Sequence, residues 1–158
     1  MPRIETSIVI LAQIERVFDL ARSIDVHVES QARHREQAVA GRTSGLIELD
    51  EHVTWRATHF GRTMHLTSKI TQYNRPQHFR DSMVDGPFLR FDHDHLFVEE
   101  VDGVRMTDIF DYESPYGILG RLADQLFLKR HMARLLEERA EVLRQLLESG
   151  NWKKYLPE

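Results

Sequence analysis

Residues 89–112, LRFDHDHLFVEEVDGVRMTDIFDY, contain the pattern that decides the fold. Apolar and polar side chains alternate on both sides of Asp102-Gly103, as expected for two antiparallel strands joined by a short hairpin turn. The same period of two extends upstream to Glu36, so we predict a sheet built from successive antiparallel hairpins. The other turn signals in this block are Gly61-Arg62, Asn74-Arg75-Pro76 and Asp85-Gly86-Pro87.

Helical patterns flank this block. Downstream, apolar residues return to helical spacing from Gly117 to Ser149, and Gly150 ends the run. A helix of this length extends about 48 Å at 1.5 Å per residue, so we expect its apolar stripe to cover the sheet and to leave a space between them. The predicted stripe is Leu119, Leu122, Leu126, Ala133, Leu136, Ala140, Leu143 and Leu147. The upstream segments predict a strand and two short helices, the second capped by Ser23: Ile4–Leu11, Gln13–Arg22 and Ile24–Gln31.

The composition excludes several classes of function. A net charge of -4 with both signs interspersed gives no basic patch for nucleic acid. The chain has no cysteine, which excludes disulfides and thiolate chemistry, and no apolar run long enough to cross a bilayer. We therefore expect residues 1–158 to form a single cytoplasmic ligand-binding domain with no nucleic-acid partner, no transmembrane segment and no cofactor.

The element order resembles the helix-grip fold of the START-like, or SRPBCC, superfamily, which includes pollen allergens, polyketide cyclases and dehydrases, and coenzyme Q-binding proteins. The opening IVILAQIERVFD, residues 8–19, resembles the first strand and helix of that superfamily, although Gln13 stands where proline is common. Other segments resemble a bacterial cyclase/dehydrase-like subgroup: Ala38–Gly41, Ser44-Gly45, Val53–Trp55, His59–Gly61 and Leu119–Asp124.

The resemblance implies an α+β fold. In it, a curved antiparallel sheet of about six to seven strands, in the order β-α-α-β-β-β-β-β-β-α, wraps around the long C-terminal helix. This fold hosts carriers, receptors and enzymes alike, so the resemblance alone does not select a function.

Period-two alternation also predicts which polar side chains share the inner face with the apolar ones. If Asp102-Gly103 is a two-residue turn, Phe97 faces Asp108, and Asp108 is a diagonal neighbour of His95. With Gly61-Arg62 as the first turn, Trp55 faces Ser68. The predicted inward polar residues are His59, Ser68, Asp81, His93, His95 and Asp108.

Two interpretations of these residues remain open: polar groups that satisfy one another in the core, or the polar lining of a ligand pocket. We predict that the protein binds a small hydrophobic molecule, lipid, isoprenoid or polyketide-like, between sheet and helix. The alternative is an aromatase/cyclase or dehydratase-type enzyme acting on a polyketide-like substrate, with His95, Asp108 and Asp81 as candidate catalytic residues. The predicted ligand-binding residues are Trp55, His59, Met64, Ser68, Phe79, Asp81, Met83, Phe91, His93, His95, Phe97, Met106, Asp108, Phe110, Tyr112, Leu122, Leu126 and Lys129.

Metal binding is the competing use of the histidines. His93 and His95 lie two apart on one strand, a spacing that suits two ligands of one ion, with Asp108 or Asp81 as a third. His59 is expected near the opposite end of the sheet, and the remaining histidines are interpreted as scattered or outward. We therefore predict no metal. Lys129 lies within the apolar stripe of the long helix, where its ammonium either reaches water or points into the cavity mouth.

Overall fold

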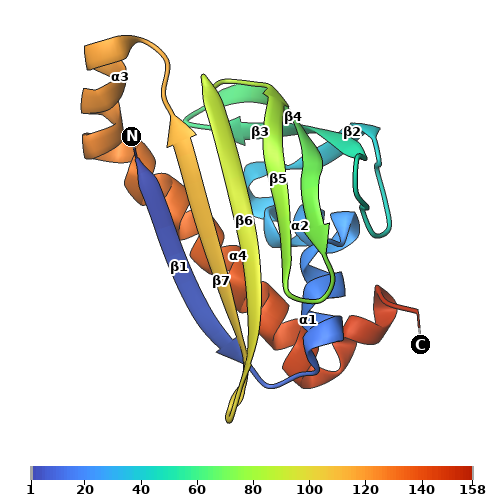
Figure 1. The fold of residues 1–158 in the computed structure, drawn as a ribbon. Coiled ribbons are helices and arrows are strands. Elements are labelled where there is room, and N and C mark those ends of the chain that lie inside the picture. Colours follow the sequence, from blue (N-terminus) through green and yellow to red (C-terminus); the bar gives the residue numbers. More distant parts are fainter. Residues whose placement is uncertain (1, 158) are drawn as a thin grey trace.

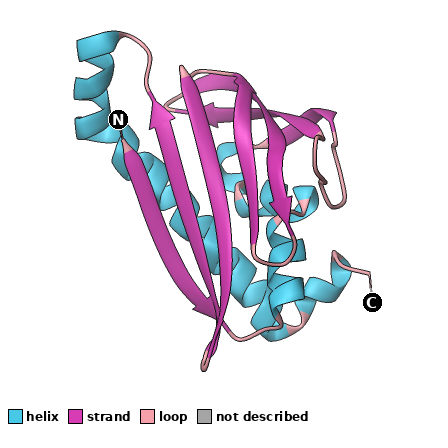
Figure 2. Cartoon of the chain, in the orientation of Figure 1, coloured by secondary structure: helices cyan, strands magenta, loops and turns pink. Residues whose placement is uncertain are grey.

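The computed structural model describes residues 2–157 as a seven-stranded antiparallel sheet with helices packed on one side (Figures 1 and 2). The strand order across the sheet is β1-β7-β6-β5-β4-β3-β2, so every pair except β1-β7 joins strands consecutive in sequence. The strands are β1 (Arg3–Ile10), β2 (Gln37–Gly41), β3 (His52–His59), β4 (Arg62–Asn74), β5 (His78–Asp85), β6 (Arg90–Glu100) and β7 (Gly103–Glu113).

The helices occupy both ends of the chain, and α4 passes behind the sheet in Figure 1. As predicted, Ser23 Oγ accepts a hydrogen bond from the Val26 N–H at the start of α2, and Gly150, at φ 85°, ends α4. The helical segments are α1 (Ile14–Ala21), α2 (Ile24–Ser30), the 3-10 turn η1 (Ala32–His34), α3 (Gly117–Ala123), the π-helical turn η2 (Asp124–Leu128), α4 (Lys129–Ser149) and the 3-10 turn η3 (Asn151–Lys154). The predicted element order and fold class are confirmed.

Both predicted hairpin registers are wrong, and for the same reason: each two-residue turn begins one residue earlier than expected. His59 pairs with Arg62, so Phe60 and Gly61 form the turn, both with positive φ. Glu100 pairs with Gly103, so Gly103 belongs to β7. When the turn begins one residue earlier, each strand residue pairs with a residue two positions away from its predicted partner. Its side chain therefore stays on the predicted face of the sheet but has different cross-strand neighbours.

The corrected registers bring together different pairs of residues. Trp55 faces Leu66, and Ser68 faces Val53 on one side and Met83 on the other. His95 faces Asp108 directly rather than diagonally. Asp81 lies opposite His93, as expected from the alternation.

The start of the long helix also differs from the prediction. Leu119, Leu122 and Leu126 are exposed, although they continue the spacing of the buried Leu136, Ala140 and Leu143. The π-helical turn η2 separates the two groups. One extra residue in a helical turn rotates the upstream part of the helix by about 100° relative to the downstream part, so the upstream stripe faces away from the sheet. Figure 2 shows α3 standing apart from the sheet.

Packing is solid at one end of the sheet and open at the other. The larger core joins α1 and α2 to the C-terminal half of α4, where Phe18 makes edge contacts with Phe79 and Phe97, and Leu143 is fully buried. A smaller cluster around Phe91, Phe110 and Leu136 lies toward the other end. Within residues 2–157, no helix has both the length and the hydropathy to cross a bilayer.

Candidate functional site: a cavity closed by a buried polar cluster

A cavity of about 550 Å³, here called the main cavity, lies between the sheet and the N-terminal half of α4. Its walls are mostly apolar because the strands turn one side of their alternating pattern toward the helix. The apolar lining includes Trp55, Ala57, Met64, Leu66, Phe91 and Phe110 from the sheet and Leu128, Met132, Leu135 and Leu136 from the last helix. This volume and lining are typical of sites for small molecules.

The structure separates the predicted ligand-binding residues into groups. Those that line the main cavity are Trp55, His59, Met64, Ser68, Asp81, Phe91, His93 and Phe110. Phe79 and His95 line only a smaller chamber behind it. Five others lie outside both linings, packed within or against the core: Met83, Phe97, Met106, Asp108 and Tyr112. Leu122, Leu126 and Lys129 are exposed and line neither space. The inward positions expected for Leu122 and Leu126 are wrong because α3 and η2 leave the sheet, whereas Lys129 takes the water-facing alternative.

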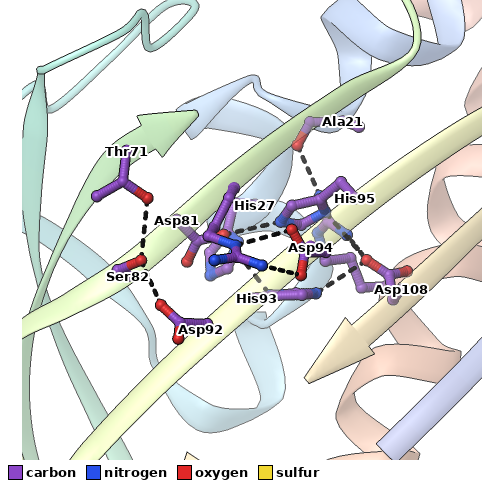
Figure 3. A network of polar contacts seen from close by, with 12 residues as sticks. Ala21, His27, Thr71, Asp81, Ser82, Asp92, His93, Asp94, His95 and Asp108 are labelled. Carbon is purple, nitrogen blue, oxygen red and sulfur yellow. Dashed lines mark hydrogen bonds and ion pairs between the residues drawn. The ribbon is translucent and has the colours of Figure 1, made fainter. Parts of the chain in front are cut away.

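Asp81, His93 and Arg139 line the inner end of the main cavity, and they contact His95 and Asp108 behind them. We call these five charged or titratable side chains the polar cluster. His93 Nε2 lies 2.9 Å from Asp108 Oδ1, and His95 Nε2 lies 2.8 Å from Asp81 Oδ1 (Figure 3). Since Asp81, His93, His95 and Asp108 come from adjacent strands β5, β6 and β7, the sheet register sets these distances.

The polar cluster is nearly dry. Asp108 is 1% exposed, His95 3%, Arg139 5% and His93 9%. Arg139 reaches in from α4, with Nη1 3.4 Å from Asp108 Oδ1, and Nη2 donates to the carbonyl oxygen of Ala21 at 2.6 Å. Buried charges at this density require partners, and each carboxylate here has them.

The pKa values of the two carboxyl groups follow from these contacts. Burial by itself raises the pKa of Asp108, but hydrogen bonds from His93 and His95 and the charge of Arg139 outweigh it and hold that pKa well below its usual range. Burial likewise acts to raise the pKa of Asp81, but the combined effect of His93 and His95 is larger, so the net shift is downward. Both carboxyl groups are therefore anionic at neutral pH.

The two histidines are shifted in opposite directions. Burial and the adjacent His95 lower the pKa of His93. Burial also acts to lower the pKa of His95, but the carboxylates of Asp108 and Asp81 outweigh it, and the net shift is upward. These opposite shifts favour protonation of His95 before His93, and in that state the cluster holds two negative and two positive charges, since arginine remains charged. This balance explains how so many ionisable groups share one buried site.

His93 is the histidine placed for chemistry in the main cavity. A neutral His93 that donates from Nε2 to Asp108 keeps its lone pair on Nδ1, and a carboxylate that fixes a tautomer in this way makes the ring a defined base. His95 instead lines the smaller chamber. The sequence suggested His95 with Asp108 as the acid/base pair, and His95 Nδ1 does lie 3.0 Å from Asp108 Oδ1. Of the two histidines that contact Asp108, however, only His93 lines the main cavity.

The smaller chamber lies beyond the polar cluster and measures about 60 Å³. It shares Trp55, Ser68, Asp81, His93 and Arg139 with the main cavity and extends to the α1–α2 connection at Arg22 and Ser23. At about 30 Å³ per water in the liquid, it has room for about two water molecules. The cluster thus stands between a mostly apolar space and a small, more polar one.

Sequence reasoning missed Arg139, although its position carried a signal. Arg139 lies three residues after Leu136 and four before Leu143, so it occupies the buried stripe of α4. An arginine at such a position indicates a buried anionic partner, whereas the sequence pattern had favoured Lys129 as the cation of interest on this helix. The contribution of His131 and Gln31 to the lining was also missed, because only the folded chain brings η1 and α4 to the cavity.

Neither a protein-family model nor a curated protein matches this sequence. Solved structures match the fold. TTHA0849 from Thermus thermophilus aligns with a TM-score of 0.77 at 19% identity, over 94% of this chain and 99% of that one. The di-domain aromatase/cyclase StfQ of the steffimycin biosynthetic pathway aligns at 0.75 and 10% identity, over 94% of this chain and 51% of that one.

A plant protein also shares the architecture. The major latex-like protein 151 from Panax ginseng has a TM-score of 0.62 at 12% identity, with 99% of this chain and 98% of that chain aligned. At these identities the likeness describes the backbone and not the ligand. Together with the observed strand order and the long C-terminal helix, the comparisons show that this chain shares the helix-grip fold of these structures.

Proposed function

We propose that this protein binds a small, largely apolar molecule, of the lipid, isoprenoid or polyketide-like kind, in the main cavity. The observation that carries the proposal is the pairing of an apolar space of about 550 Å³ with a polar cluster at its inner end. An apolar body removes its surface from water against the walls, which stabilises the complex by about 25 cal/mol per Å² buried. One polar end of the molecule then meets Asp81 and His93.

The polar cluster favours a particular kind of polar end. Asp81 is anionic and 19% exposed at its side chain, and His93 Nδ1 carries a lone pair, so both groups accept hydrogen bonds. A hydroxyl or phenol group on the ligand supplies the donor that they lack. A carboxylate on the ligand meets a like charge instead.

The binding proposal is tested by filling the cavity. Ala57 is buried on β3 and lines the main cavity, whereas Thr58 points to the other side of the same strand. Ala57→Phe is expected to weaken binding of the neutral fluorescent probe N-phenyl-1-naphthylamine by at least about tenfold, roughly 1.4 kcal/mol. Thr58→Phe is expected to change it by less than about twofold. Equal affinities of the two variants, with both folded by circular dichroism, contradict the proposal.

Native mass spectrometry of the gently purified protein gives a second test. A bound molecule that is retained by Thr58→Phe and lost from Ala57→Phe identifies the natural ligand class by its mass. Wild-type protein that carries no small molecule and binds no apolar probe overturns the proposal.

A second candidate function is an aromatase/cyclase or dehydratase-type reaction on a polyketide-like substrate. The observation that favours it is the 2.9 Å contact between His93 Nε2 and Asp108, which leaves Nδ1 of His93 as a base in the cavity wall. The walls would fold the reactive chain, and His93 would remove a proton from it. His93→Gln is expected to abolish turnover of a poly-β-ketone thioester while changing its affinity by less than about threefold. Unchanged turnover removes His93 from the mechanism.

A further inference from the structure

Three histidines that are far apart in sequence converge beside the entrance half of the main cavity. His34 ends the 3-10 turn η1, His59 ends strand β3, and His131 lies in the first turn of α4. We call them the histidine cluster. Their nearest ring nitrogens all lie within 4.8 Å of one another, and His59 Nδ1 is 3.0 Å from His131 Nε2.

The three rings pack directly against one another. The His34 and His59 rings stack at 4.9 Å with an interplanar angle of 26°, and His131 stands nearly perpendicular to both, at 80° to His59 and 88° to His34. Three imidazoles bound to one tetrahedral ion at 2.0–2.1 Å hold their nitrogens about 3.3 Å apart. The observed spacings therefore require only small side-chain movements to reach that geometry.

Hydrogen bonds within the part of the chain that the structure describes leave several ring nitrogens of the histidine cluster without a partner. His59 and His131 share one hydrogen bond, which uses one nitrogen of each ring. Among residues 2–157, the His34 ring has no side-chain hydrogen bond; it stacks on His59 and meets His131 edge to face. Three half-buried imidazoles with spare nitrogen lone pairs are donors of the kind that transition metals prefer.

The surroundings of two of the rings disfavour their protonated forms. Burial lowers the pKa of His59 and of His131, and the neighbouring histidines lower both further. Glu36 and Glu138 act in the opposite direction, but Glu36 is paired with His27 and Glu138 with Arg33. Neutral imidazole is the form that coordinates a metal, and binding then releases few protons.

We propose that His34, His59 and His131 bind a divalent transition-metal ion of the zinc class. Three imidazole nitrogens suit Zn²⁺, Ni²⁺ or Cu²⁺ and select against Mg²⁺ and Ca²⁺, which require oxygen ligands. Since His59 and His131 both line the main cavity, the fourth position is open to water or to a polar group of a bound molecule. The ion also ties η1, the β3–β4 hairpin and α4 to one another at this end of the cavity.

The proposal does not depend on the proposed function, because metal binding is measured without any organic ligand. Tag-free full-length protein is titrated with ZnCl₂ by isothermal calorimetry, and with CoCl₂ to record the visible bands of tetrahedral Co²⁺. One ion per chain is expected, with a rise in Tm that increases with metal concentration. His34→Ala, His59→Ala and His131→Ala are each expected to weaken binding by at least about 100-fold.

Two further variants locate the site. His65 is exposed on β4, within the same β3–β4 hairpin as His59, so His65→Ala is the matched control and is expected to bind like the wild type. Asp81, His93 and His95 also lie close enough to share an ion, so His93→Gln tests the polar cluster as the rival site. Binding lost in His93→Gln but retained in His131→Ala overturns the proposal, as does the absence of Zn²⁺ binding in the wild type. If His131→Ala does not fold, His34→Ala, on the surface turn η1, decides the question.

Discussion

Arg139 and Asp108 face each other inside the protein, with Nη1 3.4 Å from Oδ1, and both side chains are almost completely buried. Arg139→Met removes one of the two positive charges that balance Asp81 and Asp108. Breaking a buried pair in this way is expected to lower the free energy of unfolding by about 3–5 kcal/mol, measured by urea denaturation. Arg144→Met, on the same helix, is the control. Its pair with Glu141 is exposed to water, so a far smaller change is expected.

The opposite shifts of His93 and His95 predict a change of stability with pH. The pKa of His95 is raised in the folded state, so protonated His95 adds to the free energy of unfolding. This added stability is complete below about pH 6.5, the pKa in the unfolded chain, and is lost as the pH rises through the pKa in the folded protein. Wild-type protein should therefore lose stability as the pH rises from about 6.5 into the alkaline range, and His95→Gln should lose less over that interval. Urea unfolding at a series of pH values measures both slopes. His65→Gln should retain the wild-type slope; an identical slope in His95→Gln would show that His95 is not the group responsible.

The ligand's polar end is expected to decide affinity through Asp81. In competition with the naphthylamine probe, 1-decanol should displace it at about tenfold lower concentration than decanoate, because the anionic carboxyl group of the acid meets Asp81. Asp81→Asn removes that negative charge, so the displacing concentrations of 1-decanol and decanoate should become more similar. If the variant keeps the full preference, the polar end does not lie at the polar cluster.

Gly103 is expected to tolerate no side chain. It has φ 137°, and a Cβ atom built on it would lie 2.4 Å from the backbone oxygen of Ile10. Gly103→Ala therefore has two costs: the strain of a side chain at positive φ, and a clash between β7 and the end of β1. Together they should lower the free energy of unfolding by more than about 2 kcal/mol. Gly150→Ala, at φ 85° with open space around it, should cost only the backbone term of about 1–2 kcal/mol. Equal losses in the two variants would show that β1 moves aside to accept the methyl group.

The alternation of side chains along the strands was enough to predict the fold and the inward direction of His93, His95 and Asp108. The cross-strand partner of each of these residues was not predictable from the alternation. It depends on the hairpin register, which in turn depends on which residues adopt positive φ in the turn. Phe60 does so at the β3–β4 turn, and a bulky residue in that conformation has no simple sequence signal. The corresponding error at the β6–β7 turn placed Asp108 diagonal to His95, whereas it lies directly opposite.

The rest of the site depends on long-range geometry. His34, His59 and His131 meet only after η1, β3 and α4 are packed, and their spacing in the sequence contains no motif. The π-helical turn η2 was equally hidden, because residues Asp124–Leu128 satisfy an α-helical pattern as well. Arg139 was the exception: its place in a buried stripe was visible, and it would have predicted the acidic partner.

The π-helical turn has a consequence for how a ligand enters and leaves. It separates α3 from the remainder of the last helix, which packs into the core through Leu143 and Leu147. Gly120 and Ala123 of α3 form part of the cavity wall, while Ile118 and Leu119 are in contact with water. Swinging this segment outward breaks no hydrogen bond of the sheet ladder, because none of its residues pairs with a strand within residues 2–157. We therefore expect exchange on the microsecond-to-millisecond timescale of helix-end motions, without the slow global unfolding that escape through seven paired strands would demand.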